Sequence, residues 1–290
     1  MTEAANVESQ IDSVSAAMGG LNDVDLGRVS DQMLDIGSSS KFSTIEVGQL
    51  QEQLAKSGLG IEDVLGGATQ AAVDLAAATG EDLVGSGTAA AAMMNMFNLE
   101  GDQMAGVADT ITAGLNASSM SLADYQRGVS TLGPVMANLS QYANDQVGAF
   151  EDSTAALAYF NSQGLKGAEV GTSLARMYTK LSDPTSEATA QMSALGLSAF
   201  DMEGNFRPLP DIMDDLNTAM GGLSDQAREQ ALAQIFGAEA ADVMNIAIKK
   251  GGQGLRDYEA DMVSSGQAAE QAAIRQDNFN GSLEQMGGAL

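Results

Sequence analysis

The sequence predicts a mainly α-helical protein, a multi-helix assembly of short amphipathic helices that are rich in alanine and glycine. Apolar residues recur every three to four positions along most of the chain, which places them on one face of a helix. Only 4% of the residues are aromatic, none is tryptophan and 17 are methionine, so small and flexible side chains must build the core. Such side chains favour close packing of helix against helix.

The most regular helix is predicted in residues 164–184. Its apolar stripe is formed by Val170, Leu174, Met177, Tyr178 and Leu181. Pro184 ends the helix, because proline disfavours helical geometry at the residue before it. Gly167 and Gly171 leave part of the helix without side chains, so we expect that another backbone could approach closely there.

The sequence predicts two regions, a short one at the N-terminus and a long one after it. Residues 1–38 contain two segments with helical spacing and form an N-terminal helical lead-in, whereas residues 39–290 form a helical core. Ser43 to Glu46 has the pattern of a capping box, which opens a helix that stops at Gly58. A second helix is expected over residues 61–79, closed by a glycine.

The middle of the chain predicts helices at residues 102–115, from 121 onward, at 145–163 and at 187–195. Gly133–Pro134 should kink or break the second of these, because a proline inside a helix removes a hydrogen bond and clashes with the preceding turn.

One small β-hairpin-like element is predicted near residues 199–207, where two short extended arms flank a turn containing Gly204. Pro208 and Pro210 lack a backbone N–H, so this hairpin must be small and lie at an edge. Further helices are predicted at residues 211–220, 224–236, 238–250, 255–263 and 268–290.

Charge and composition exclude several classes of function. The net charge of −26, from 39 acidic and 13 basic residues, repels nucleic-acid phosphates and anionic membranes, so no sequence-specific nucleic-acid binding is expected. The chain has no cysteine and no histidine, which removes disulfides, thiolate metal sites and the commonest general base. The first residues carry no signal-peptide pattern, and the longest near-apolar run, residues 89–97, is too short to span a membrane.

No motif predicts catalysis, and we expect a non-enzyme without cofactor or metal. Gly85–Ala90 imitates a dinucleotide-binding turn, but no strand precedes it, so the beginning of a helix is the better interpretation. Glu151–Asp152 and Asp214–Asp215 could supply a carboxylate pair for glycoside hydrolysis. Neighbouring residues on a helix point about 100° apart, however, so a solvated helix face explains these pairs better.

Several segments, in a fixed order, resemble one family. Residues 164–184 are similar to the core region of phage tail tape measure proteins, and the likeness continues through residues 195–212 and 223–241. Upstream, residues 43–58 and 74–80 fit the same pattern, so the resemblance covers roughly residues 38–290. The positions that it marks for backbone geometry or packing are Gly164, Gly167, Gly171, Thr172, Leu181, Pro184, Gly204, Pro208, Leu209 and Gly237.

The resemblance implies a structural role in the tail of a phage or prophage. The expected functions are self-association in the growing tail tube, determination of tail length and release ahead of the DNA. The implied partners are further copies of the chain, tail-tube subunits and tail assembly chaperones, and the implied locations are the virion tail lumen and, during assembly, the host cytoplasm. In this family a long helical region follows the core, so we expect the core to continue into one.

Two other hypotheses stay open from the residues alone. The chain could be a soluble acidic helical interaction module, such as a secreted effector or an adhesin, unrelated to tails. It could also be a cell-wall hydrolase that uses paired carboxylates. Co-purification with tail-tube subunits would separate the tail protein from the interaction module.

Overall fold

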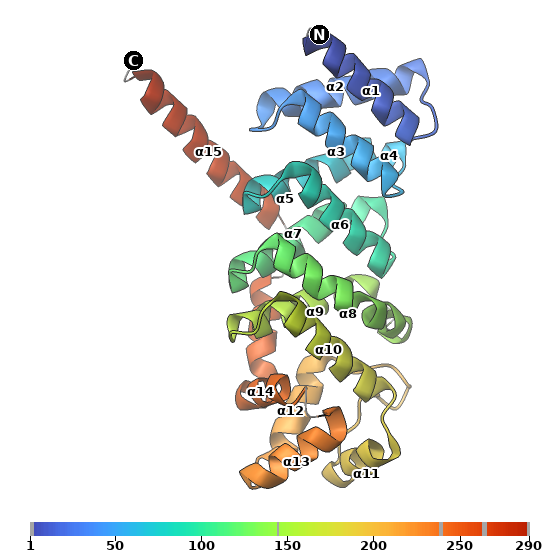
Figure 1. Cartoon of the computed structure of the whole chain (residues 1–290), viewed down its shortest axis with the longest axis vertical. Coiled ribbons are helices and arrows are strands. Elements are labelled where there is room, and N and C mark those ends of the chain that lie inside the picture. The colour runs from blue at the N-terminus through green and yellow to red at the C-terminus, as the bar shows by residue number, and fades with distance from the viewer. Residues whose placement is uncertain (1–2, 144, 238–239, 263–265, 289–290) are drawn as a thin grey trace. The chain divides into compact units, whose positions relative to one another are not determined.

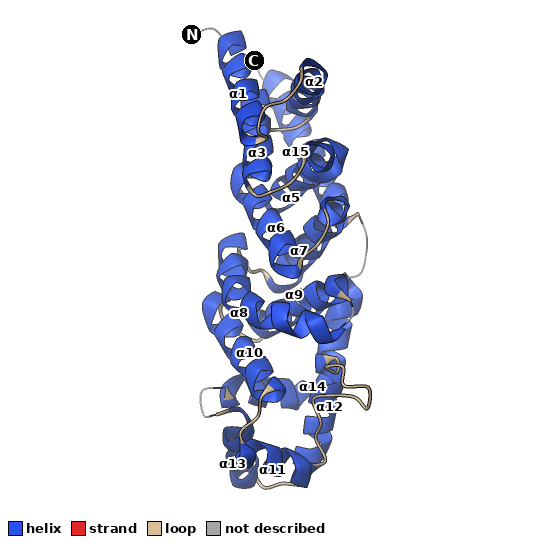
Figure 2. Ribbon diagram, turned by 90° about the vertical axis from the view of Figure 1, so that its right-hand side faces the viewer, coloured by secondary structure: helices blue, strands red, loops and turns tan. Residues whose placement is uncertain are grey.

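The computed structural model describes residues 3–143, 145–237, 240–262 and 266–288, which form helices joined by loops (Figures 1 and 2). The mainly α-helical prediction is confirmed. The chain divides into two compact units: unit 1 consists of Met1–Ala113 and Ser264–Leu290, and unit 2 of Gly114–Val263. No helix in the described part of the chain is both long and apolar enough to cross a bilayer.

Unit 1 is built from helices at both ends of the chain. They are α1 (Glu3–Ala17), α2 (Asp23–Ser39), α3 (Thr44–Lys56), α4 (Ile61–Asp63), α5 (Thr69–Thr79), α6 (Leu83–Phe97), the first part of α7 (Met104–Ser118) and α15 (Gln267–Gly288). Helix α3 packs against α1, α2 and α6, and α5 packs against α6 and α15. The predicted capping box of α3 is confirmed: the Ser43 N–H donates to the Glu46 carboxylate at 2.7 Å, and the Glu46 N–H donates to the Ser43 hydroxyl at 3.3 Å.

The single helix predicted over residues 61–79 is wrong. A π-helical turn at Val64–Ala68 separates α4 from α5, and Gly67 within it has a φ of 142°, which only glycine adopts readily. The predicted stop at Gly80 is present, since this residue is left-handed and ends α5.

Small residues let the helices of unit 1 approach closely. A Cβ atom added to Gly87 on α6 would lie 2.2 Å from the Leu50 side chain of α3. Five alanines on α5 are buried: Ala71, Ala72, Ala76, Ala77 and Ala78. The core therefore consists of thin helix faces, as the alanine-rich composition predicts.

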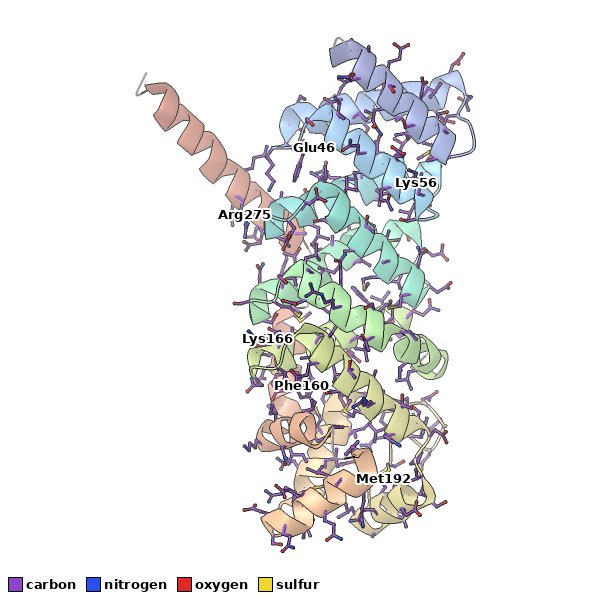
Figure 3. The ribbon with its side chains drawn as sticks, in the orientation of Figure 1. Glu46, Lys56, Phe160, Lys166, Met192 and Arg275 are labelled. Carbon is purple, nitrogen blue, oxygen red and sulfur yellow. The ribbon has the colours of Figure 1, made fainter. Side chains whose placement is uncertain are left out.

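The C-terminal helix α15 returns to unit 1. Its first turn is capped by Asp109 of α7, whose carboxylate accepts the N–H of Gly266 at 2.6 Å and the N–H of Ala268 at 2.8 Å. Ala268 and Ala272 are buried, and Arg275 lies against Gly80 at the end of α5 (Figure 3). Two distant parts of the sequence thus share one core.

Unit 2 is one continuous stretch of chain. After the end of α7 it contains α8 (Leu122–Ala143), α9 (Gln146–Ser162), α10 (Gly167–Ser182), α11 (Ser186–Leu195), α12 (Leu209–Met220), α13 (Asp225–Phe236) and α14 (Ala241–Met262). Its core holds four fully buried aromatic side chains, Tyr125, Phe150, Tyr159 and Phe160. The break considered at Pro134 is absent, because α8 continues to Ala143.

The predicted β-hairpin at residues 199–207 is wrong, since the described residues contain no strand. Phe200 and Phe206 form one isolated antiparallel bridge. The carboxylate of Asp201 accepts the N–H of Glu203 at 3.0 Å and the N–H of Asn205 at 2.8 Å. These backbone donors are therefore used within a turn and are not available for pairing between strands. Pro208 follows at once without an N–H, and the ladder cannot extend.

The two helices predicted at 238–250 and 255–263 correspond to the two parts of α14. A kink at Gly251, which has non-helical backbone angles (φ 63°, ψ −172°), separates these parts. The predicted interruption is therefore present, although it is shorter than expected. The outermost positions of these predictions, residues 238, 239 and 263, lie outside the described residues.

Candidate functional site

A close helix crossing of unit 2 lies at Gly171, within the segment singled out from the sequence. A Cβ atom added to Gly171 of α10 would lie 2.1 Å from the carbonyl oxygen of Gly128 on α8 and 2.7 Å from its Cα. Real Cβ atoms do not approach backbone this closely, so only glycine fits here. Val170 and Leu174 are buried beside the crossing. The two backbones lie in direct contact, which fixes how α8 and α10 pack.

The other predicted residues of this segment define the ends and the buried face of α10. Gly164, in the turn before the helix, has a φ of 100° and donates its N–H to the Asn161 carbonyl at 2.9 Å. Gly167 is the first residue of α10, and the Thr172 hydroxyl donates to the Ala168 carbonyl at 2.7 Å.

The far end of α10 follows the same local rules. Leu181 is 2% exposed and belongs to the apolar stripe. Pro184 follows Asp183, the residue that ends the helix with non-helical backbone angles (φ −135°, ψ 72°).

A second group of predicted residues lies in the loop after α11. Gly204 has a φ of 87° in the turn held by Asp201, and the hydrogen bonds from Asn205 and Glu203 lower the pKa of the Asp201 carboxyl. Pro208 caps α12 and Leu209 is buried at its first position, two residues earlier than predicted. The structure brings this loop to α10, because the ring centres of Phe206 and Tyr178 are 5.7 Å apart.

Gly237 stands apart from both groups. It follows α13 with a φ of 82°, and its N–H donates to the Ala233 carbonyl at 3.0 Å. This residue ends a helix, and its conformation disfavours other residue types.

The sequence did not predict the partners in two helix–helix contacts of unit 2, that of α8 with α10 and that of α12 with α14. Gly128 was not singled out, although a glycine inside a long apolar helix pattern is a signal for close packing. On α14, a Cβ atom added to Gly252 would lie 2.0 Å from the Pro210 carbonyl oxygen of α12. Arg256 of α14 pairs with Asp214 and Asp211 of α12, each at 2.6 Å.

Both carboxylates of the pair Asp214–Asp215, considered above for catalysis, form ion pairs with arginines. Asp214 pairs with Arg256, which lowers the pKa of the Asp214 carboxyl, and Asp215 pairs with Arg207 at 2.7 Å. The two neighbouring carboxylates therefore bind two different guanidinium groups. In the described ranges, no three carboxylates converge to hold a metal ion.

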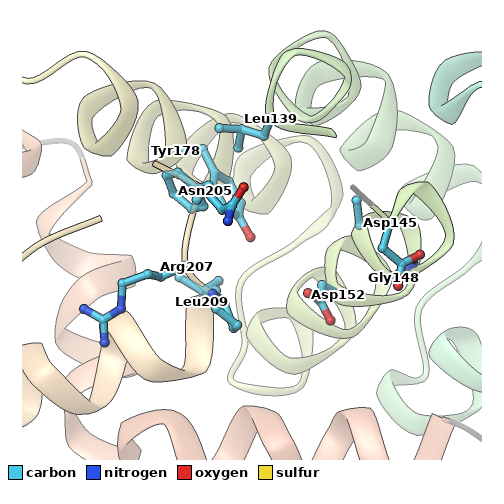
Figure 4. A pocket seen from close by; sticks show the side chains of 11 residues that line it. Leu139, Asp145, Gly148, Asp152, Tyr178, Asn205, Arg207 and Leu209 are labelled. Carbon is cyan, nitrogen blue, oxygen red and sulfur yellow. The ribbon is translucent and has the colours of Figure 1, made fainter. Parts of the chain in front are cut away.

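A cavity of about 270 Å³ lies where α8, α9 and α10 meet the loop before α12 (Figure 4). Its lining comprises Leu139, Asp145, Gly148, Ala149, Asp152, Tyr178, Asn205, Phe206, Arg207, Pro208 and Leu209. Burial, and then the nearby charges of Glu151 and Asp145, raise the pKa of the Asp152 carboxyl to about 6. The other member of the second predicted pair, Glu151, does not line this cavity.

Comparison with known proteins identifies relatives over nearly the whole chain. Residues 30–237, which include α10 and the loop of Gly204, match the family described as phage-related minor tail protein. The chain is 30% identical over 284 residues to the tape measure protein of Pneumococcus phage Dp-1, covering 98% of this chain and 24% of that protein. It is 22% identical over 264 residues to the probable tape measure protein of Escherichia phage P2, covering 90% of this chain and 31% of that protein. No solved structure matches the chain.

Proposed function

Because the chain belongs to the phage-related minor tail protein family and corresponds to a region of tape measure proteins, we propose that it acts in tail assembly, tail-length determination and DNA passage through the tail tube. The observation that carries this proposal is the similarity to a tape measure protein over 98% of the chain. The chain spans about a quarter to a third of the length of these relatives, so the role proposed is that of one region.

The helices support a compact assembly module within that region. Within unit 1 and within unit 2, successive helices pack against one another and bury a core, whereas an extended ruler would expose most of its residues. Gly171 and Gly128 lie in the matched range, and their contact requires folded neighbours. The proposed structural role needs no catalytic residue, cofactor or metal.

The proposed partners follow from the tail context. They are further copies of the chain, tail-tube subunits and tail assembly chaperones, met in the host cytoplasm during assembly and afterwards in the tail lumen. A net charge of −26 suits a lumen through which DNA must pass without binding. Residues 1–38, which form α1 and α2, are proposed as a lead-in to the core.

Tail length in phage that lack this whole segment in frame tests the proposal. A compact module predicts tails that fail to form or vary in length. An extended helical ruler of 290 residues predicts a uniform shortening of up to about 435 Å, at ~1.5 Å per residue. Unchanged, infectious tails would contradict any role in assembly or length.

A single substitution tests the packing part of the proposal. Gly171→Leu should abolish tails, because the new side chain would meet the Gly128 carbonyl. Gly106→Leu is the matched control, since no atom lies within 4 Å of that position on α7. Normal tails and a normally folded chain with Gly171→Leu would refute the claim.

A further inference from the structure

We propose that the cavity between α8, α9, α10 and the loop before α12 binds an organic cation, an alkylammonium or guanidinium group such as the head of a lysine or arginine side chain. Three features of its lining support this: an unpaired carboxylate, the hydroxyl of a buried tyrosine that no described residue hydrogen-bonds, and two aromatic rings.

The unpaired carboxylate is Asp152 of α9. It is half-buried, and no described residue donates a hydrogen bond to it or forms an ion pair with it. Its neighbours Asp145 and Glu151 are acidic as well, although one oxygen of Asp145 accepts the Gly148 N–H at 2.9 Å. A desolvated carboxylate surrounded by like charge is stabilised by a cation.

The one basic residue among the described lining residues does not supply that cation. Figure 4 shows the Arg207 side chain directed away from the other labelled groups. Its guanidinium donates to the Asp215 carboxylate at 2.7 Å and to the Ser198 carbonyl at 2.9 Å. The cavity therefore keeps acidic and aromatic walls.

The hydroxyl belongs to Tyr178 of α10. Only 3% of this residue is exposed, it lines the cavity, and no described residue hydrogen-bonds to its hydroxyl group. Burial, and then the charges of Asp152 and Glu259, raise the pKa of this phenol, so it stays neutral and can accept an N–H from a cation. The hydroxyl therefore offers a ligand in the cavity an acceptor that no described residue uses.

Aromatic faces complete the site. The rings of Tyr178 and Phe206, with centres 5.7 Å apart, both line the cavity, and such faces attract ammonium and guanidinium groups. Leu139 and Leu209 provide apolar contact for an alkyl stem. At about 270 Å³ the cavity lies just below the range of about 300–1,000 Å³ for small-molecule sites, so it fits one side chain or a small amine.

The test titrates the intact chain with n-butylguanidinium at pH 7.5, followed by saturation-transfer NMR, with n-butanol as the neutral analogue. We expect saturable millimolar binding of the cation and none of the alcohol. Asp152→Asn should weaken binding about tenfold or more, and Tyr178→Phe several-fold, as losses of charge-assisted contacts predict. Asp183→Asn, at an exposed position of the same unit, should leave binding unchanged.

Binding should also strengthen from pH 5 to pH 8, as the Asp152 carboxyl ionises. The titratable groups that interact with it are Asp145 and Glu151 near or on α9, Tyr178 on α10 and Glu259 on α14, and Arg207 lines the same cavity. Glu259 in turn interacts with Arg256 on α14 and Asp211 on α12. Circular dichroism and thermal melts establish that each variant is folded.

Two arms distinguish the source of the cation. A blocked tripeptide with a central arginine that binds as well as n-butylguanidinium assigns the site to a protein side chain. Binding of n-butylguanidinium alone assigns it to a small free cation. Equal binding by folded wild-type and Asp152→Asn chains, equal binding of n-butanol, or no saturable binding would overturn the proposal.

Discussion

The two units differ in the partners of their carboxyl groups and in the atoms that meet at their close helix contacts. In unit 1, every carboxyl with a shifted pKa has a described partner: Glu46 with Ser43, Glu52 with Lys56, Glu62 with Arg28 and Asp74 with Gln70. In unit 2, Asp152 has none, and one oxygen of Glu259 is buried without a hydrogen bond. Burial raises the pKa of Glu259 to about 7. We therefore expect the stability of unit 2 to depend more on pH than that of unit 1.

The close contacts differ in the same direction. Gly87 of unit 1 meets the end of a leucine side chain, which can move, and Gly37 of unit 1 meets the Thr44 backbone at 2.8 Å. Gly171 and Gly252 of unit 2 lie nearer still to backbone carbonyls, at 2.1 and 2.0 Å. Unit 1 should therefore tolerate substitution better than unit 2. Substitutions in the full chain test this difference. Hydrogen exchange followed by mass spectrometry shows in which unit each substitution changes the stability.

The largest effect is expected for Gly171→Ala. Even one methyl group would lie 2.1 Å from the Gly128 oxygen, so we expect unit 2 to lose about 3 kcal/mol or more. Gly106→Ala on α7 of unit 1 should instead add about 0.5–1 kcal/mol, because that helical position is exposed and open. Chemical denaturation measures both, and a similar small change in the two variants would remove the proposed contrast.

The next effect concerns Asp152 and pH. Its pKa is raised from 3.8 to about 6, so the folded state binds the proton more tightly than the unfolded state. The stabilising effect of this proton is fully present below about pH 4 and is lost as the pH rises through about 6, a change of at most about 3 kcal/mol.

Asp152→Asn should remove this part of the pH dependence. The variant should gain up to about 3 kcal/mol over the wild type at pH 8 and about nothing at pH 3.5, by urea denaturation at each pH. Asp183→Asn serves as the control for the lower net charge. Parallel stability curves for Asp152→Asn and the wild type would show that the carboxylate is not desolvated.

A smaller effect is expected at the cap of α15. Asp109→Ala removes the acceptor of two backbone N–H groups and should destabilise unit 1 by about 1–2 kcal/mol. Exchange should accelerate in α15 and α5 and stay unchanged in unit 2. Asp102→Ala, at an exposed residue that takes no part in this cap, should change neither. Acceleration in unit 2 alone would contradict the assignment.

The smallest effect is expected at Ser43. Ser43→Ala breaks the capping box of α3 and should cost unit 1 about 1 kcal/mol. Ser9→Ala, in the exposed middle of α1, should slightly favour its helix, because alanine has the higher propensity. Equal thermal shifts for the two variants would mean that the cap contributes nothing.

Local signals in the sequence predicted much of the fold. The capping box at Ser43, the stop at Gly80 and the stop before Pro184 depend on neighbouring residues alone, and all are present. The turn at 201–205 shows the limit, because the Asp201 side chain took backbone donors that a hairpin needs. A close approach at Gly171 could be expected, because glycine leaves that part of the helix without a side chain. Its partner Gly128 could not be predicted, since the packing of α8 against α10 decides which residue lies opposite Gly171.

The candidate site was less predictable for the same reason. Tyr178 and Phe206 lie on segments that the sequence singled out separately, and only the folded chain brings their rings together. Asp152 was considered with its neighbour Glu151, whereas its surroundings come from α10 and α14. A pKa raised by burial has no signature in the sequence.

The return of α15 to unit 1 has a consequence for synthesis on the ribosome. Unit 2 is contiguous and can fold as soon as it has emerged, whereas unit 1 lacks α15 until residues after 263 are made. Translation of the roughly 150 intervening residues takes about 10–30 s at typical rates. During that interval the face of α5 that α15 later covers is open, so a nascent chain carries an apolar surface that the finished one has buried. That surface is open to a folding helper for a limited time, which ends when α15 has emerged and packed on α5.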